Sequence, residues 1–453
     1  MPRLLLPLTI LLALALAAPA GAARTQSMTF EAPRDLMNPD LRAGALDEIS
    51  SFGVRSMRVI VTWQSVAPRA DSAQRPDFEP TDPDAYSWGE IEPLVAAIKA
   101  RGWSVLMTIS GPVPQWATQA KRDNLTRPSA SAFAAFTTAV GRKFGSQVDT
   151  WAIWNEPNQP QFLRPQYARG GRAASPGIYR NLYRAGVRGL EKAGQGDDKM
   201  LIAETSPRGN SNVVAPLRFL RGMLCLDSRY KKRSKCGALD ADGYAHHAYT
   251  TRQGPSFKPP QKDDVTIGAL SRLTKALNRA HSARALTKRL PIYLTEFGIQ
   301  STPDLQQGVS LRRQVQYRAI SERIAWNNPR VVAFSQYLLT DSEPTGPKQY
   351  GGFESGLRFS DGKPKPSLKA FRLPLAVKRT GSRVSIWGLV RPATGVTTAT
   401  ITYADRGRSF KKLRTVRTNS RGYFTVSSTW RKGRRWNLTW EGQSGYPVES
   451  YQR

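Results

Sequence analysis

The sequence predicts an α/β fold: a (β/α)8 or TIM barrel over residues 24–371, followed by a small all-β sandwich over residues 372–453. Three observations support this prediction. Eight short β-rich runs alternate with longer helical segments, the pattern changes after Phe371 to short strands separated by turns, and 453 residues suffice for a large domain and a smaller one.

The strands predicted for the barrel are short runs bounded by turn-forming residues. They are Met28–Ala32, Ser56–Trp63, Ser104–Ser110, Thr150–Asn155, Met200–Glu204, Ala241–Tyr249, Pro291–Glu296 and Val331–Leu338. Helical segments expected between them are Trp88–Arg101, Ala130–Phe144, Ser175–Ala193, Thr266–Leu286 and Val309–Asn327. An open doubly wound sheet competes with this architecture. It would need a Gly-rich phosphate-binding turn after an early strand, and the sequence has none.

The C-terminal region reads as an antiparallel sandwich with Gly- or Asn-containing turns. Its predicted strands are Arg383–Val390, Thr397–Tyr403, Lys412–Thr418, Gly422–Ser428 and Arg435–Trp440. We hypothesise that this domain associates with a glycan or a cell wall. Its aromatic residues offer sugar contacts, although core packing is the commoner role for such side chains: Trp387, Tyr403, Trp430 and Trp436.

Residues 1–23 read as a secretory signal peptide. Arg3 provides the positive start, residues 4–18 form the apolar stretch, and small residues at 18–22 offer cleavage sites. A membrane anchor is the alternative, but the apolar run is short for a span and ends in Pro and Gly. We therefore expect a mature protein that is secreted, extracellular or associated with the cell envelope, without a transmembrane segment.

The two cysteines, Cys225 and Cys236, are eleven positions apart and are candidates for a local disulfide in an exported protein. Two unpaired thiols in a surface loop are the alternative. No cysteine and histidine cluster has the spacing of a metal site, so neither a metal nor another cofactor is expected.

The formal net charge is +33, and residues 372–453 hold 17 Lys and Arg against 3 Asp and Glu. A partner rich in phosphate or carboxylate groups, such as an anionic cell-envelope polymer, fits this excess. Nucleic acid is a less favoured polyanion. The plainest reading is an Arg-rich composition with a solvated surface.

Two glutamates end apolar runs. Glu156 lies in the segment Trp-Asn-Glu-Pro-Asn at 154–158, and Glu296 lies in Leu-Thr-Glu-Phe-Gly at 294–298. A carboxylate at the tip of a buried strand is costly to desolvate and adds nothing to packing, which points to function. Strict alternation places Ala152, Trp154 and Glu156 on one face, and likewise Ile292, Leu294 and Glu296. Both glutamates then face the barrel mouth, as in the carboxylate pair that cleaves glycosidic bonds.

Other polar residues can support such a pair. Arg58 can keep one glutamate ionised, unless it is a structural ion pair. His247 and Tyr249 share a face next to Glu296, and Asn155 can donate a hydrogen bond to a sugar hydroxyl. His246 has the opposite parity and is expected to face the helices. Glu204 is a third acidic candidate or the partner of an arginine.

Aromatic residues in the loops that follow the strands, Trp63 and Trp116, are candidates to stack on sugar rings; the alternative is that each packs its own loop.

Several of these motifs together resemble clan A glycoside hydrolases, especially families 5 and 39. The segment 148–158 is similar to their acid/base motif and 294–298 to their nucleophile strand. Arg58 is similar to the arginine of their second strand, His247-Ala248-Tyr249 to their His-x-Tyr, and the closing segment 356–366 is similar too. The resemblance covers about residues 28–371.

The resemblance implies retaining hydrolysis, with Glu156 as acid/base and Glu296 as nucleophile, and a polysaccharide or oligosaccharide as substrate. Many relatives carry a tryptophan platform near the tip of strand eight, where this chain has Tyr337. The alternative function is a secreted protein that binds carbohydrate or the cell envelope on the same barrel without catalysis.

Overall fold

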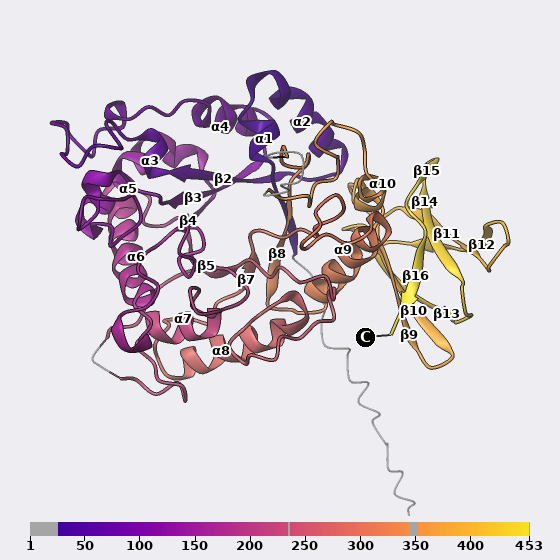
Figure 1. Ribbon diagram of the computed structural model, residues 1–453. Helices are drawn as coiled ribbons and strands as arrows, with labels where there is room; N and C mark the ends of the chain where they lie inside the picture. Colours follow the sequence, from indigo (N-terminus) through magenta and orange to yellow (C-terminus); the bar gives the residue numbers. More distant parts are fainter. Residues whose placement is uncertain (1–25, 234–235, 345–351, 453) are drawn as a thin grey trace, which may run out of the picture.

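The computed structural model describes residues 26–233, 236–344 and 352–452, so the predicted signal peptide at 1–23 lies outside the described residues. It shows a closed barrel of eight parallel strands in the order β1 to β8, followed by a β sandwich (Figure 1). The predicted fold class is therefore confirmed.

The eight barrel strands coincide with the eight predicted runs. They are β1 Ser27–Glu31, β2 Ser56–Thr62, β3 Ser104–Ser110, β4 Thr150–Ile153, β5 Lys199–Thr205, β6 Gly243–His246, β7 Ile292–Leu294 and β8 Val331–Tyr337. β4, β6 and β7 end two or three residues earlier than predicted. The residues that follow them, including both glutamates, therefore lie in the loops at the barrel mouth.

The helices surround the barrel. They are α1 Pro33–Leu36, α2 Pro39–Ser51, α3 Trp63–Val66, α4 Ile91–Ala100, α5 Ala130–Phe144, α6 Ser175–Lys192, α7 Pro216–Met223, α8 Leu270–Ser282, α9 Leu311–Trp326 and α10 Pro366–Arg372. α5 has its predicted bounds, because the Ser129 side chain accepts a hydrogen bond from the backbone N–H of Ala132 and fixes the first turn.

The barrel interior holds a small apolar layer, and a much larger apolar cluster fills the space between strands and helices. The interior layer consists of Leu106, Ala152, Leu201 and Ala245, with Tyr293 packed against it. Ile292 and Leu294 belong to the outer cluster instead. The predicted facing of β7 is thus wrong by one residue, and the pairing of β7 with β8 is irregular at Ile292 and Tyr293.

The C-terminal domain begins with β9, soon after α10. Its strands are β9 Leu375–Thr380, β10 Arg383–Leu389, β11 Thr398–Ala404, β12 Lys411–Arg417, β13 Tyr423–Thr429, β14 Arg435–Trp440, β15 Gln443–Ser444 and β16 Val448–Tyr451. Five of these match predicted strands; β9, β15 and β16 were not predicted. β16 joins the two halves of the sandwich, because it pairs antiparallel with β14 and parallel with β9. Trp387 and Trp436 are fully buried, which assigns them to core packing.

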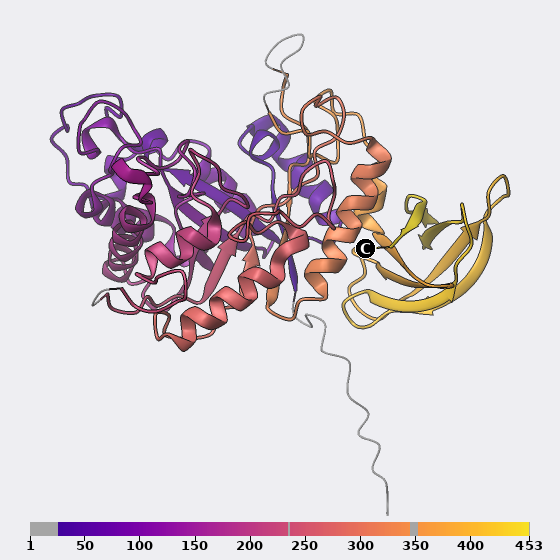
Figure 2. The same cartoon turned by 60° about the horizontal axis from the view of Figure 1, so that its bottom comes forward.

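Helix α9 lies between the barrel and the sandwich (Figure 2). Glu322 on this helix is buried between Arg318, at 3.2 Å, and Arg391 of the sandwich, at 2.8 Å. Arg323 donates hydrogen bonds to the backbone oxygens of Ala376 and Ser385. The two domains therefore share a buried polar interface.

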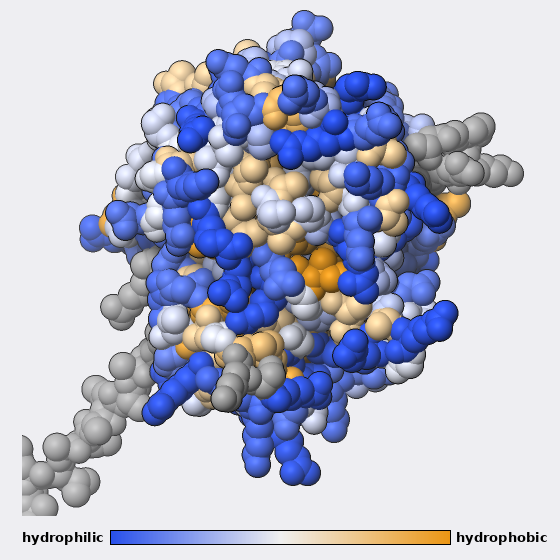
Figure 3. All heavy atoms as spheres, turned by 90° about the vertical axis from the view of Figure 1, so that its left-hand side faces the viewer, coloured by the Kyte–Doolittle hydropathy of each residue, from blue (hydrophilic) through white to orange (hydrophobic). Residues whose placement is uncertain are grey.

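Hydrophilic residues cover most of the face shown in Figure 3, with small hydrophobic areas between them. Within the described ranges, no helix has the length and apolarity needed to cross a membrane.

Candidate active site

The backbone leaves regular strand geometry where β4 ends. Trp154 and Glu156 have φ values of 75° and 38°, in the left-handed region that residues other than glycine rarely adopt. The Trp154 ring consequently packs against Phe133 of α5 and donates a hydrogen bond to the backbone oxygen of Phe162. The predicted shared face of Ala152, Trp154 and Glu156 is therefore wrong at Trp154, although Glu156 does face the mouth.

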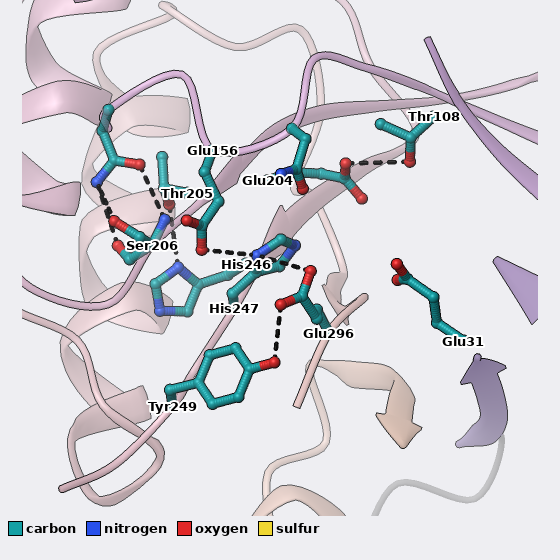
Figure 4. A network of polar contacts seen from close by, with 12 residues as sticks. Glu31, Thr108, Glu156, Glu204, Thr205, Ser206, His246, His247, Tyr249 and Glu296 are labelled. Atoms are coloured by element: carbon teal, nitrogen blue, oxygen red, sulfur yellow. Dashed lines mark hydrogen bonds and ion pairs between the residues drawn. The ribbon is translucent and has the colours of Figure 1, made fainter. Parts of the chain in front are cut away.

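Glu156 and Glu296 converge on one imidazole ring, as Figure 4 shows. Nδ1 of His247 lies 2.9 Å from Oε1 of Glu156 and 3.6 Å from Oε2 of Glu296. These two carboxylate oxygens are therefore at most about 6.5 Å apart, the sum of the two distances. The Tyr249 hydroxyl donates to the other oxygen of Glu296 at 2.7 Å.

Arg58 contacts three of the carboxyl groups at the site. Its Nη1 contacts Glu31 and donates to Glu296 at 3.1 Å. Its Nη2 donates to Asn155 at 2.8 Å and to Glu204 at 2.9 Å, and its Nε donates to Thr108 at 3.2 Å. A guanidinium has five N–H groups, and these five contacts engage all of them. Arg58 therefore positions other side chains and has no donor left for a substrate.

The two glutamates have different environments. Burial raises the pKa of Glu156, and its hydrogen bond with His247 offsets only part of that effect. Burial alone would also raise the pKa of Glu296, but His247, Arg58 and the Tyr249 hydroxyl outweigh it and lower that pKa. Burial would lower the pKa of His247, and the carboxylates of Glu296 and Glu156 reverse this and raise it. The site thus favours a protonated Glu156 beside an ionised Glu296.

A cavity of about 650 Å³ opens above these groups. Of the predicted site residues, those lining it are Arg58, Asn155, Glu156, Tyr249, Glu296 and Tyr337. His247 is fully buried behind the two glutamates. Tyr337 packs edge-on against Phe353, with ring centroids 5.1 Å apart.

Trp63 and Trp116 do not line this cavity, which corrects their prediction as sugar-stacking residues. Their rings pack edge-on at 5.7 Å, and Trp63 also stacks on Phe136 of α5 at 5.0 Å. Both side chains are buried in the apolar cluster between strands and helices. Both residues therefore have a packing role, although Trp63 begins α3 and packs on α5 instead of on its own loop.

Glu31 is a site residue that was not predicted. It ends β1, lines the cavity and shares Nη1 of Arg58 with Glu296. Burial raises the pKa of Glu31 to about 7, with Arg58 acting in the opposite direction. A signal was present in the sequence, because Glu31 is an acidic residue near the end of the predicted strand Met28–Ala32. Glu204 takes the second of its two predicted roles, since it pairs with Arg58.

His246 lies outside the active site, as its parity predicts. It is buried against Thr205, at 3.0 Å, and the backbone oxygen of Val265, at 2.7 Å.

Cys225 and Cys236 form a disulfide with their Cα atoms 6.2 Å apart. The described part of the chain contains no group of three or more His, Cys, Asp or Glu residues arranged to hold a metal ion.

No protein-family model and no curated protein matches this chain. Solved structures share its fold. A glucosidase from Croceicoccus marinus is 12% identical with a TM-score of 0.56, and the alignment covers 93% of this chain and 96% of the glucosidase. A monomeric beta-xylosidase from Caulobacter crescentus CB15 is 17% identical with a TM-score of 0.51, covering 93% and 97%. The GH39 enzyme from Xanthomonas axonopodis pv. citri is 16% identical with a TM-score of 0.51, covering 93% and 95%. The chain therefore has the barrel fold of clan A glycosidases, and at these identities the likeness concerns the fold alone.

Proposed function

We propose that this protein is a retaining glycoside hydrolase that cleaves an O-glycosidic bond by double displacement. The observation that carries the proposal is the pair Glu156 and Glu296, held by one imidazole, with a raised pKa on the first and a lowered pKa on the second. Retaining enzymes place their carboxyl groups about 5–5.5 Å apart, and inverting enzymes about 6.5–9.5 Å apart. The limit of about 6.5 Å between one oxygen of each group includes the retaining range and reaches only the lower end of the inverting range, which supports the retaining proposal.

In the first step, an oxygen of Glu296 attacks the anomeric carbon while the bond to the leaving oxygen breaks. Glu156 transfers its proton to that oxygen, so the leaving group departs as an alcohol and a glycosyl ester of Glu296 remains. Water then attacks the same carbon, gives its proton to Glu156 and displaces Glu296 as a carboxylate. The sugar retains its configuration, and both side chains return to their starting states.

The supporting residues have separate roles in this scheme. Arg58 and Tyr249 keep the Glu296 carboxylate ionised and oriented. His247 holds one oxygen of Glu156 and leaves the other to carry the proton. The carbonyl oxygen of the Asn155 side chain accepts a hydrogen bond from Arg58, so the amide nitrogen of Asn155 stays available for a sugar hydroxyl.

Replacement of each glutamate by glutamine tests the proposal on a panel of aryl glycosides and polysaccharides. We expect Glu296→Gln to abolish turnover of every substrate, because no nucleophile remains. Glu156→Gln should lose activity mainly on substrates with poor leaving groups, since good ones depart without protonation. Unchanged thermal unfolding controls for folding. Turnover surviving in Glu296→Gln contradicts the assignment, and affinity for a glycan without any product from the wild-type protein favours the binding-protein alternative.

We also propose export and association with an anionic cell-envelope polymer. Export is supported by the N-terminal sequence and the Cys225–Cys236 disulfide, because disulfides persist outside the cytoplasm. Edge strand β12 presents exposed cations at Lys411, Lys412, Arg414 and Arg417. Changing these four residues to glutamine should weaken retention on cell envelopes at low salt more than at high salt. Equal retention at both salt concentrations argues against the polymer.

A further inference from the structure

Glu31 lies in the catalytic cavity without a role in the double-displacement scheme. It reaches the site from the tip of β1, and Figure 4 shows its carboxyl group turned toward that of Glu296. One oxygen of Glu31 contacts Nη1 of Arg58, which also donates to Glu296. The other oxygen has no hydrogen-bond partner within the described parts of the chain, and the side chain lines the cavity.

The charges around the cavity are one-sided. Among its described lining residues, Glu31, Glu156 and Glu296 are acidic, and Arg58 is the one cation. All five N–H groups of Arg58 are already engaged, and the imidazole of His247 faces the two catalytic glutamates. A carboxylate on a bound sugar would therefore lie among carboxylates without an available cationic donor. A hydroxyl group, by contrast, can donate to the unshared oxygen of Glu31.

We propose that Glu31 is a specificity-determining residue. Its unshared oxygen accepts a hydrogen bond from a hydroxyl of an uncharged sugar, and its negative charge excludes sugars that carry a carboxylate. This inference rests on the proposed function, because it places a sugar ring in the cavity. It also runs against the net charge of +33, which by itself would suggest an acidic substrate.

Binding measurements test the inference without requiring turnover. We would titrate phenyl 1-thioglucoside and phenyl 1-thioglucuronide, in both anomeric forms, into the wild-type protein and Glu31→Gln by calorimetry at pH 8. These ligands differ only in a CH2OH or carboxylate group, and their sulfur-linked bond resists cleavage. At pH 8 the carboxyl group of Glu31 is ionised, since its pKa is about 7.

The wild-type protein should bind the neutral member of the better-bound pair at least about 10-fold more tightly than the acidic member. Glu31→Gln should reduce that preference by about 10-fold or more, because its amide keeps the shape of the side chain without the charge. Asp35→Asn is the matched control. Asp35 is buried four positions along and bonds Thr340, outside the cavity, so the preference should persist there.

Equal wild-type affinities, a preference for the acidic sugar, no measurable binding of either sugar, or an unchanged preference in Glu31→Gln would each overturn the inference. The proposed hydrolysis is assessed separately, by product formation from O-glycosides. A protein that binds the neutral sugar selectively but never releases product would leave the role of Glu31 intact and remove the hydrolytic function.

Discussion

Glu156 and Glu296 differ because the groups that lower a carboxyl pKa are distributed unequally between them. Arg58 donates to Glu296 and not to Glu156, and Tyr249 likewise contacts Glu296 alone. His247 contacts both carboxyl groups and is closer to Glu156. Burial acts to raise the pKa of both groups, and the asymmetric placement of Arg58 and Tyr249 helps to leave Glu156 with a raised pKa and Glu296 with a lowered one. The buried imidazole of His247 lowers the pKa of both glutamates.

This arrangement predicts how activity depends on pH. Activity needs an ionised Glu296, so it is lost as pH falls through the lowered pKa of that group. It also needs a protonated Glu156, so it is lost as pH rises through the raised pKa. His247 lowers both values. Replacing it with asparagine should therefore move both limbs of the pH profile of kcat/KM to higher pH. Limbs that stay in place, or move in opposite directions, would contradict the role assigned to His247.

At the scale of the element, strand existence was predictable and strand endings were not. All eight barrel strands follow from β-rich runs, because parallel strands buried on both faces are continuously apolar. The predicted facing failed at Trp154, just after β4, and at Leu294, the last residue of β7, because alternation was assumed to continue across each strand end to the glutamate beyond it. β4 ends at Ile153 and enters left-handed backbone at Trp154. A single sequence carries no marker for such a φ value when the residue is not glycine.

Gly111, in the turn after β3, provides a test of whether Trp154 positions Glu156. A Cβ atom on Gly111 would lie 2.6 Å from the ring of Trp154, two residues before Glu156. Gly111→Ala should therefore displace that ring, destabilise the protein by about 1–3 kcal/mol and lower kcat/KM by about 10-fold. Thermal unfolding and kinetics on an aryl glycoside measure both effects. Gly44→Ala, in α2 with open space around the new methyl group, is the control and should not reduce activity. Normal kinetics in Gly111→Ala would show that Trp154 does not position Glu156.

For the whole molecule, the net charge and the predicted domain boundary describe only part of what the structure shows. The net charge of +33 is positive, whereas the charged residues that line the cavity are Glu31, Glu156, Glu296 and the single cation Arg58 within the described chain. The predicted boundary at 371 lies within α10, four residues before β9, yet the domains are not independent. Glu322 and Arg391 are 69 positions apart, and the sequence around neither residue predicts their contact. Arg323, in turn, donates to backbone oxygens of the sandwich, a kind of contact that leaves no residue signature.

The interface between the domains should therefore contribute strongly to stability. Arg391 donates to Glu322 at 2.8 Å and to the backbone oxygen of Phe371 at 2.8 Å, and it covers the Phe371 ring. Among the described residues, Arg391→Ala leaves the buried Glu322 with Arg318 as its one remaining cationic partner, which should cost about 3–5 kcal/mol of the free energy of unfolding. Arg431→Ala, at an exposed contact 3.9 Å from Asp405, should cost less than about 1 kcal/mol. Denaturant unfolding compares the two variants. Below the midpoint of its unfolding transition, Arg391→Ala should retain kcat, because Glu322 faces the sandwich and does not line the cavity. Equal stability of the two variants would show that the sandwich is attached to the barrel without supporting it.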